Sequence, residues 1–214
     1  MSKSMRIGRS LLEIMLLLIA AGSGIVVAAC VIITTGDFND KCLLYSYVSD
    51  SKAGNEHILY TMTWKGSANC RFIIIVQVVA AMFALITIAV QGYFLLKRKS
   101  HGTSVPLLFT GLYTVSFTFI LVSSCILSAG FREYCDSWLQ SLGERDLNCR
   151  AVQRIQWSKA SSIKGDRFYD VLSTAQTATW ISFSVWMMLP LVAWAGVRFV
   201  TNRRHQEPAS DIPT

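Results

Sequence analysis

Four long apolar segments constrain this chain more than any other feature. They cover residues 11–33, 72–96, 105–129 and 172–197 of a 214-residue sequence. A helix needs about 20 residues to cross the hydrocarbon core of a bilayer, so each segment is long enough to span it. Only 15% of the residues are charged, against about 25% in a typical soluble domain. The sequence therefore predicts an all-α fold, a four-helix transmembrane bundle in contact with the lipid bilayer.

The basic residues predict which side of the membrane each connecting segment faces. About one position in four is Lys or Arg in the N-terminus (1–10), the turn (97–104) and the tail (198–214), against about one in seven in the loops 34–71 and 130–171. Short cytosolic segments carry the excess of positive charge. We therefore expect both termini and the turn in the cytosol, and both loops on the extracellular or luminal side. The net charge of +7 then lies beside anionic lipid and predicts no nucleic-acid partner.

The first apolar segment also has some features of a signal peptide. It follows a basic start and contains the small-residue stretch Val27-Ala28-Ala29-Cys30. The apolar region of a signal peptide typically has 7–15 residues, whereas this segment continues to Ile33. We expect it to stay in the membrane as the first helix. Cleavage would instead leave three spans and a luminal N-terminus.

Four of the six cysteines lie in the two predicted outer loops, Cys42 and Cys70 in the first and Cys135 and Cys149 in the second. Disulfides persist in extracellular and luminal compartments, so this placement supports the predicted sidedness independently of the basic residues. Bridges within each loop are the simplest pairing, although four cysteines allow three connectivities. The other two cysteines lie within apolar segments, and we expect them to pack as small apolar side chains; they are Cys30 and Cys125.

Small and polar residues within the apolar segments predict how the helices pack. Ala20, Gly24 and Ala28 recur every four residues, the spacing that lets helix backbones approach closely in lipid. We interpret this stripe as a packing face within the chain, with homo-oligomer formation as the alternative. Gln77 and Gln91 are the strong polar residues of the second segment. They are expected to form hydrogen bonds between helices, or alternatively to line an aqueous path.

Charged groups are rare in the apolar segments. Glu13 is the only acid there, one turn inside the predicted cytosolic end, where it can reach the interface or pair with Arg9 four residues earlier. Channels and transporters more often carry ionisable residues at mid-membrane depth. This pattern therefore disfavours an ion channel or channel accessory subunit, which stays as the alternative function.

The sequence contains no recognisable catalytic arrangement. His57, His101 and His205 fall in three different connecting segments on two sides of the predicted membrane. No HExxH, phosphate-binding glycine loop or nucleophile elbow occurs. The carboxylates of the outer loops alternate with Lys and Arg, as on a solvated surface. We therefore predict no enzymatic activity, no cofactor and no metal site; an enzyme that acts on lipid is the least favoured alternative.

The outer loops also indicate a family. They lack the Cys-Cys-Gly motif of tetraspanins, and Trp64 and Cys70 are only a faint echo of the first-loop motif of claudins. The loops instead resemble the transmembrane protein 179 family, most closely its B branch. The resemblance is carried by Gly36-Asp37-Phe38, Cys42-Leu43-Leu44-Tyr45, Cys70-Arg71-Phe72, Val122-Ser123-Ser124-Cys125-Ile126-Leu127, Cys135, Cys149, Ala151, Gln153, Ile155, Trp157, Phe168-Tyr169 and Ala175-Gln176-Thr177 with Trp180. It implies a four-pass membrane protein with luminal cysteines and implies no catalytic or ligand-binding residue.

These observations together predict a non-enzymatic tetraspan protein of the plasma membrane or of secretory-pathway or vesicle membranes. Its two disulfide-containing loops and its helix faces would contact other membrane proteins.

Overall fold

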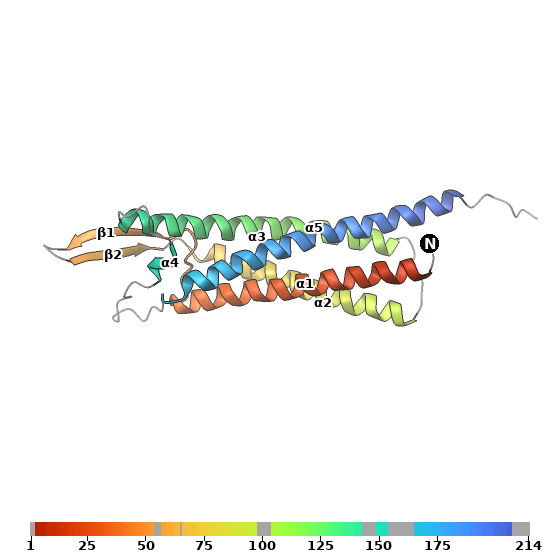
Figure 1. Cartoon of the computed structure of the whole chain (residues 1–214), viewed down its shortest axis with the longest axis horizontal. Helices are drawn as coiled ribbons and strands as arrows, with labels where there is room; N and C mark the ends of the chain where they lie inside the picture. The colour runs from red at the N-terminus through yellow and green to blue at the C-terminus, as the bar shows by residue number, and fades with distance from the viewer. Residues whose placement is uncertain are drawn as a thin grey trace, which may run out of the picture.

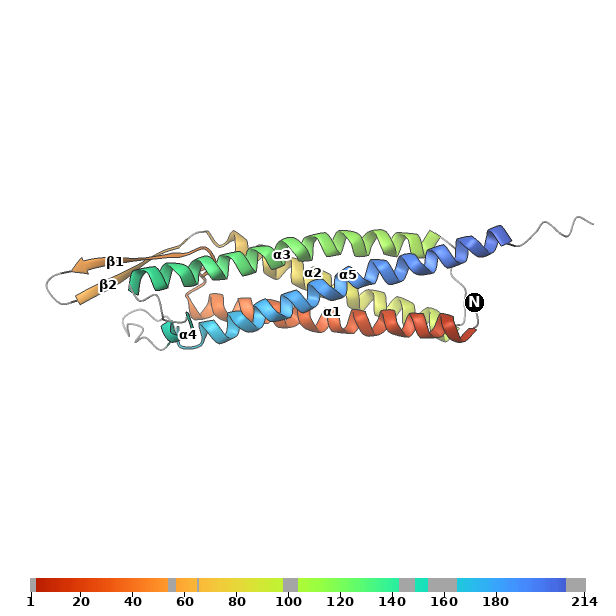
Figure 2. The same cartoon turned by 45° about the horizontal axis from the view of Figure 1, so that its top comes forward.

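The computed structural model describes residues 3–53, 57–64, 66–97, 104–142, 149–153 and 165–206. Four long helices lie side by side along the long axis of the molecule (Figures 1 and 2). They are α1 (Lys3–Asp37), α2 (Ala68–Lys97), α3 (Ser104–Leu142) and α5 (Phe168–Gln206). Most of the predicted turn at 97–104 and the end of the predicted tail lie outside the described residues.

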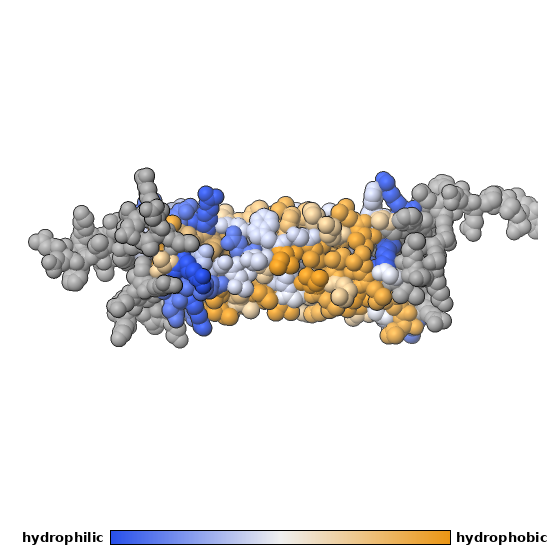
Figure 3. All heavy atoms as spheres, viewed as in Figure 1, coloured by the Kyte–Doolittle hydropathy of each residue, from blue (hydrophilic) through white to orange (hydrophobic). Residues whose placement is uncertain are grey.

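All four helices are long and apolar enough to cross a membrane. Large apolar side chains cover much of their outer surface. On the face seen in Figure 3, an apolar belt crosses the middle of the molecule, with hydrophilic side chains toward both ends. Exposing such a surface to water would be unfavourable, whereas lipid tails are as apolar as the surface itself. The chain is therefore an integral, multi-pass membrane protein, and the predicted four-helix transmembrane bundle is confirmed.

The helices pack in a fixed order around the bundle. α1 lies along both α2 and α5, α3 lies along α5, and α2 touches α3 over a shorter length. The start of α1 and the end of α5 lie at the same end of the bundle (Figure 1). This arrangement follows from an even number of spans, and it is the geometry that the predicted cytosolic placement of both termini requires.

The helix α3 continues well beyond the apolar segment that ends at Ala129. Its last turns place Phe131, Tyr134 and Trp138 on one buried face, at the three- and four-residue spacing of a helix. The predicted second loop therefore begins as a helix that projects past the apolar belt. Polar residues between these aromatic side chains lower the apolar character of this stretch, which is why the apolar segment alone does not reveal it.

A β-hairpin lies beside this projecting part of α3 (Figures 1 and 2). Strand β1 (Tyr47–Ala53) pairs antiparallel with β2 (His57–Thr63), with Tyr47 opposite Thr63 and Ala53 opposite His57. The one-turn helix α4 (Cys149–Val152) lies at the same end of the molecule. The hairpin is the part of the fold that the all-α prediction missed.

The buried side chains form two clusters. One belongs to the bundle and contains Leu17, Tyr113, Trp186 and Leu189. The other lies mainly at the hairpin end, where we define the head as the described residues of 38–64, 130–153 and 165–169. Its core contains Phe38, Leu43, Leu44, Phe131, Tyr134, Trp138, Val152 and Phe168, and it continues into the bundle through Val27, Val31 and Ala175.

Candidate functional site

Two disulfides brace the head. Cys42 is bonded to Cys70 at the start of α2, and Cys135 on α3 is bonded to Cys149 at the start of α4. This is the pairing within each predicted loop. Each bridge ties a connecting segment to a helix that enters the membrane, so the loops are fixed relative to the bundle.

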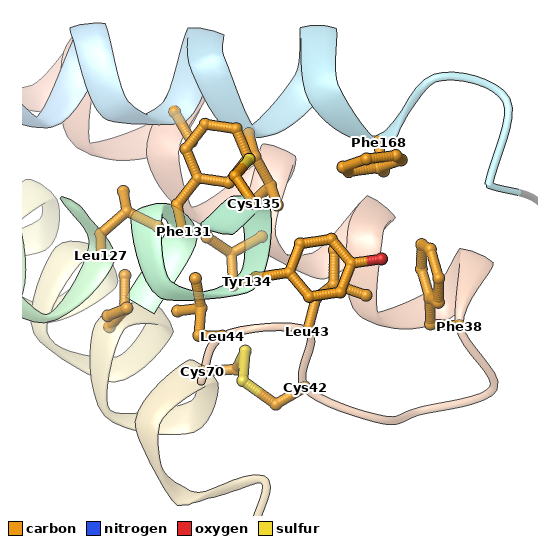
Figure 4. Close-up of a cluster of buried hydrophobic side chains, with 14 of the residues drawn as sticks. Phe38, Cys42, Leu43, Leu44, Cys70, Leu127, Phe131, Tyr134, Cys135 and Phe168 are labelled. Atoms are coloured by element: carbon orange, nitrogen blue, oxygen red, sulfur yellow. A yellow bond between two sulfur atoms is a disulfide. The ribbon is translucent and has the colours of Figure 1, made fainter. Parts of the chain in front are cut away.

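Aromatic side chains fill the space between these bridges (Figure 4). The ring of Phe168 meets the rings of Tyr134 and Phe38 edge to face, with centroids 5.5 and 6.4 Å apart. Phe38 also contacts Trp64 with centroids 6.1 Å apart. Edge-to-face pairs of this kind stabilise a core beyond the area that they bury. The head therefore has its own aromatic core, built from the end of α1, the projecting part of α3 and the start of α5.

The segment between α1 and β1 presses closely against α3 at Gly130. The backbone N–H of Tyr45 donates to the carbonyl of Gly130 at 3.3 Å. A Cβ atom on Gly130 would lie 2.8 Å from the Tyr45 ring and 2.9 Å from Leu44 Cβ. Tyr45 itself has a positive φ of 62°, an unusual conformation for a bulky residue. The absence of a side chain at Gly130 is thus what lets the loop reach the helix.

Two serines of α3 cover the free edge of β1. The N–H of Val48 donates to Ser137 Oγ at 2.7 Å, and Ser141 Oγ donates to the Val48 carbonyl at 2.9 Å. The two serines are four residues apart and so lie on one face of the helix. An uncovered strand edge is a template for unwanted pairing. The projecting part of α3 therefore takes the place of a third strand.

Ion pairs connect the elements of the head at its surface. The guanidinium of Arg167 contacts the carboxylate of Asp37 at 3.2 Å, joining the start of α5 to the end of α1. This hydrogen bond and the charge of Asp37 raise the pKa of Arg167. Arg150 on α4 contacts Asp170 on α5 at 3.3 Å. These exposed pairs orient neighbouring elements and contribute little stability.

Gln77 is the centre of a buried polar group in the half of the bundle nearer the head. Its side chain is 0% exposed, and its amide nitrogen donates to Ser123 Oγ at 3.4 Å and to Thr179 Oγ1 at 3.2 Å. Ser124 Oγ lies 3.1 Å from Thr179 Oγ1. We call these four residues the Gln77 layer. It joins α2, α3 and α5 inside the apolar belt through neutral hydrogen bonds.

Gly24 lets α1 approach this layer. A Cβ atom there would lie 3.2 Å from the Gln77 carbonyl oxygen and 3.6 Å from Ala81 Cβ. Ala20 and Ala28, four residues before and after, are also buried. In this structure, the small-residue stripe thus lies within the bundle, and at Gly24 it faces α2. Homo-oligomer formation is not needed to explain it.

A second polar group lies nearer the chain termini. Glu13 is only 7% exposed, and it interacts with Gln91 of α2 and Tyr113 of α3 as well as with Arg9. Gln91 Nε2 donates to the Tyr113 hydroxyl at 3.4 Å, and Arg9 Nη2 donates to the Ala193 carbonyl of α5 at 3.3 Å. We call Arg9, Glu13, Gln91 and Tyr113 the Glu13 layer. It joins all four helices and, unlike the Gln77 layer, it carries charge.

The Glu13 layer was only partly predictable. The expectation that Glu13 reaches the interface is wrong, because its carboxyl is buried between helices, whereas its interaction with Arg9 agrees with the expected pairing. Arg9 also reaches α5. Gln91 does form the expected bond between helices. Tyr113, Ser123, Ser124 and Thr179 were not predicted as partners of these polar residues, because helical spacing identifies a buried face on one helix and does not identify its partner on another.

The free cysteines have different surroundings. Cys30 is half-buried against the head core, whereas Cys125 is exposed on the outer surface of α3. The expectation of a packed side chain is therefore wrong for Cys125. Among the described residues, no group of three or more His, Cys, Asp or Glu side chains is arranged to hold a metal ion. His101 lies outside the described residues, and His57 and His205 are at opposite ends of the chain's fold.

Comparison with known families agrees with this architecture. A family model described as the transmembrane protein 179/179B claudin domain matches residues 9–212, nearly the whole chain. The chain belongs to the transmembrane protein 179/179B family. The resemblance seen in the loops is confirmed. The claudin character in the family's description was not predicted, because the first outer loop carries only a faint echo of the claudin motif.

Individual relatives show the same relationship. Transmembrane protein 179B of Danio rerio is 31% identical over 171 residues, covering 78% of this chain and 74% of the relative. The Mus musculus protein of that name is 25% identical over 197 residues, covering 91% and 86%. The Homo sapiens protein is 25% identical over 175 residues, covering 80% and 76%. No solved structure matches the chain.

Proposed function

We propose that this protein is a non-enzymatic interaction or accessory protein, whose head binds another membrane protein on the non-cytosolic side. The observation that carries the proposal is the construction of the head. Two disulfides, an aromatic core and the projecting part of α3 hold its surface in one arrangement relative to the bundle. A surface fixed before binding loses less conformational entropy when a partner docks.

The proposed topology places both termini in the cytosol and the head outside the cell or in the lumen. The asymmetry of the basic residues supports this sidedness, and so does a head that contains disulfides. The proposed membranes are the plasma membrane and those of the secretory pathway or its vesicles. The apolar segments 11–33, 72–96, 105–129 and 172–197 are the proposed spans.

We do not propose the channel alternative, because it requires Gln77 or Gln91 to line water. Gln77 is fully buried and bonds to Ser123 and Thr179. The exposed hydroxyls of Thr114 and Thr118 donate to carbonyls of their own helix, which satisfies them without water.

The test is proximity labelling in live cells with the labelling enzyme fused to the head side, compared between the native chain and a Cys42→Ser, Cys70→Ser double variant. Removing both cysteines loosens the head without leaving an unpaired thiol. We expect a reproducible set of labelled membrane proteins that shrinks several-fold in the double variant at equal abundance. A Cys125→Ser variant, which changes an exposed cysteine outside the head core, should label the same set as the native chain.

Two results would contradict the proposal. One is an identical set of labelled proteins with and without the Cys42–Cys70 bridge. The other is labelling of cytosolic proteins by the enzyme fused to the head side, which would show that the head faces the cytosol.

A further inference from the structure

A shallow groove runs along the outer surface of α5 in the half of the bundle nearer the head. Its volume is about 540 Å³, within the range of small-molecule sites. It is lined by Gln176, Thr177, Trp180, Ile181, Ser184 and Val185. These residues extend over about 14 Å of helix at 1.5 Å per residue, which is the scale of a rigid ring system rather than of a whole lipid chain.

The groove opens toward the bilayer. It lies within the helix that spans from Phe168 to Ala195, and Trp180 and Ile181 are 40% and 48% exposed. Figure 3 shows a paler, weakly polar surface in this half of the apolar belt. An occupant must therefore reach the groove from within the membrane.

Trp180 forms a wall of the groove that is fixed in place. Its indole N–H donates to Ser128 Oγ of α3 at 3.0 Å. Its ring also meets Phe183 edge to face, with centroids 5.5 Å apart. A large ring held on two sides offers flat apolar area without losing rotamer freedom on binding. Such a wall suits a flat, rigid ligand better than a flexible acyl chain.

Two of the three polar residues that line the groove, Gln176 and Thr177, lie toward the head, and the third, Ser184, donates its hydroxyl hydrogen to the Trp180 carbonyl. Gln176 and Thr177 come one turn before Trp180, where the exposed apolar side chains of α5 begin. Thr177 donates its hydroxyl hydrogen to the Ser173 carbonyl, so its oxygen can still accept a hydrogen bond. Ile181 and Val185 extend the groove toward the middle of the membrane. The polar end and the apolar body of the groove thus follow the polarity gradient of the bilayer.

The described lining contains no charged side chain. A phospholipid headgroup would be expected to find a Lys or Arg for its phosphate. A lipid whose polar end is a single uncharged hydroxyl is the better match, since Gln176 and Thr177 can accept a hydrogen bond from that hydroxyl or donate one to it.

We propose that this groove binds a sterol, with its hydroxyl at Gln176 and Thr177 and its ring system against Trp180, Ile181 and Val185. This inference is independent of the partner-binding function proposed above. It assigns a ligand class to a surface inside the membrane, on a different part of the molecule from the head.

The test is photolabelling of the purified full chain in phosphatidylcholine vesicles that contain a diazirine analogue of cholesterol. Mass spectrometry of the digested protein locates the label. We expect label concentrated between Gln176 and Val185, and competed away by unlabelled cholesterol. Trp180→Ala should lower this labelling roughly threefold to tenfold, the effect of losing one aromatic contact. Trp194→Ala is the matched control, because Trp194 is 48% exposed on the same helix outside the groove.

A second variant keeps the test decisive if Trp180→Ala disturbs the contact between α3 and α5. Ser184→Phe fills the groove and leaves the Trp180 bond to Ser128 in place, so it should abolish the label at Gln176–Val185. Label spread evenly over the outer faces of α1 and α2 would overturn the proposal in favour of bulk lipid contact. Equal labelling by a phosphatidylcholine probe, or cross-linking of two copies through this groove, would also overturn it.

Discussion

The head and the bundle bury similar side chains against different solvents. Leu43 in the head is 1% exposed and Leu189 in the bundle is 0% exposed. The unfolded head meets water, so burial of Leu43 is driven by the hydrophobic effect. If the bundle helices came apart, Leu189 would be exposed to lipid tails, which are as apolar as leucine itself. Burial of Leu189 therefore stabilises the bundle through packing alone. Equal burial therefore does not mean equal stabilisation in this molecule.

The two regions also differ in how their polar groups are satisfied. In the head, backbone groups such as those of Val48 are satisfied by serines of α3, and the charged pairs lie at the surface. In the bundle, polar side chains of different helices meet in two buried layers, one neutral and one containing Glu13. Both disulfides involve the head: Cys135–Cys149 lies within it, and Cys42–Cys70 ties it to the start of α2. The head is thus fixed by covalent bonds and water-driven burial, and the bundle by close packing and hydrogen bonds between helices.

The largest expected effect comes from removing both disulfides. The bridges close segments of 28 and 14 residues, and the chain-entropy relation gives a loss of about 3.5 and about 3 kcal/mol respectively. Replacing all four cysteines with serine should therefore expose the head to limited proteolysis while the four spans remain protected. Cys125→Ser, at an exposed position outside the head core, should leave the proteolysis pattern unchanged. Equal resistance of both variants would show that the bridges do not stabilise the head.

A matched pair of truncations tests the difference between the solvents. Leu43→Ala should cost about 3–5 kcal/mol, because it loses both transfer free energy and packing. Leu189→Ala should cost about 2 kcal/mol less, since only the packing loss applies in lipid. The free energy of unfolding is measured by denaturant titration of the protein in bicelles. Equal losses of unfolding free energy at Leu43 and Leu189 would contradict the claim that the head and the bundle bury their side chains against different solvents.

Two glycines of α1 test the close contact inside the bundle. Gly24→Ala places a Cβ atom 3.2 Å from the Gln77 carbonyl oxygen, and overpacking of this kind costs about 1–3 kcal/mol. At Gly22 nothing lies within 4 Å of the new atom, so Gly22→Ala should be neutral or slightly stabilising. The same unfolding titration compares the two variants. A stabilising Gly24→Ala would place α1 farther from α2 than described here.

The smallest expected effect is at the Gln77 layer. Gln77→Leu removes bonds to Ser123 and Thr179 and should cost about 0.5–1.5 kcal/mol, the range for hydrogen bonds between membrane helices. Val78→Leu, at an exposed neighbouring position, is the control and should change nothing measurable. A loss of several kcal/mol at Gln77 would mean that the layer, rather than packing, holds the bundle together.

The sequence predicts the bundle better than the head for a physical reason. A membrane span is specified by about 20 local apolar residues, so composition alone locates it. The hairpin depends on Ser137 and Ser141 reaching Val48, which is 89 residues away from the first of them. Contacts this distant leave no local pattern. The disulfide pairing could be predicted, because the two cysteines of each bridge lie in the same predicted loop on the oxidising side of the membrane.

The Gln77 and Glu13 layers were less predictable than the membrane spans and more predictable than the hairpin. Gln77 and Gln91 were recognisable as polar residues in an apolar segment, and this pattern favoured hydrogen bonds between helices. Their partners Thr179 and Tyr113 come from other helices, and their identity depends on how the helices are rotated against one another. Glu13 was visible as the only acid, but its burial follows from Gln91 and Tyr113 meeting it across the bundle.

The redox state of the six cysteines in living cells tests most directly whether disulfides brace the head on the non-cytosolic side of the membrane. Cells are treated with a membrane-permeant alkylating reagent, and the protein is isolated and analysed by mass spectrometry without reduction. We expect linked peptides joining Cys42 to Cys70 and Cys135 to Cys149, with neither pair alkylated. Alkylation of all four would place the head in a reducing compartment, and it would contradict both the braced head and the proposed sidedness.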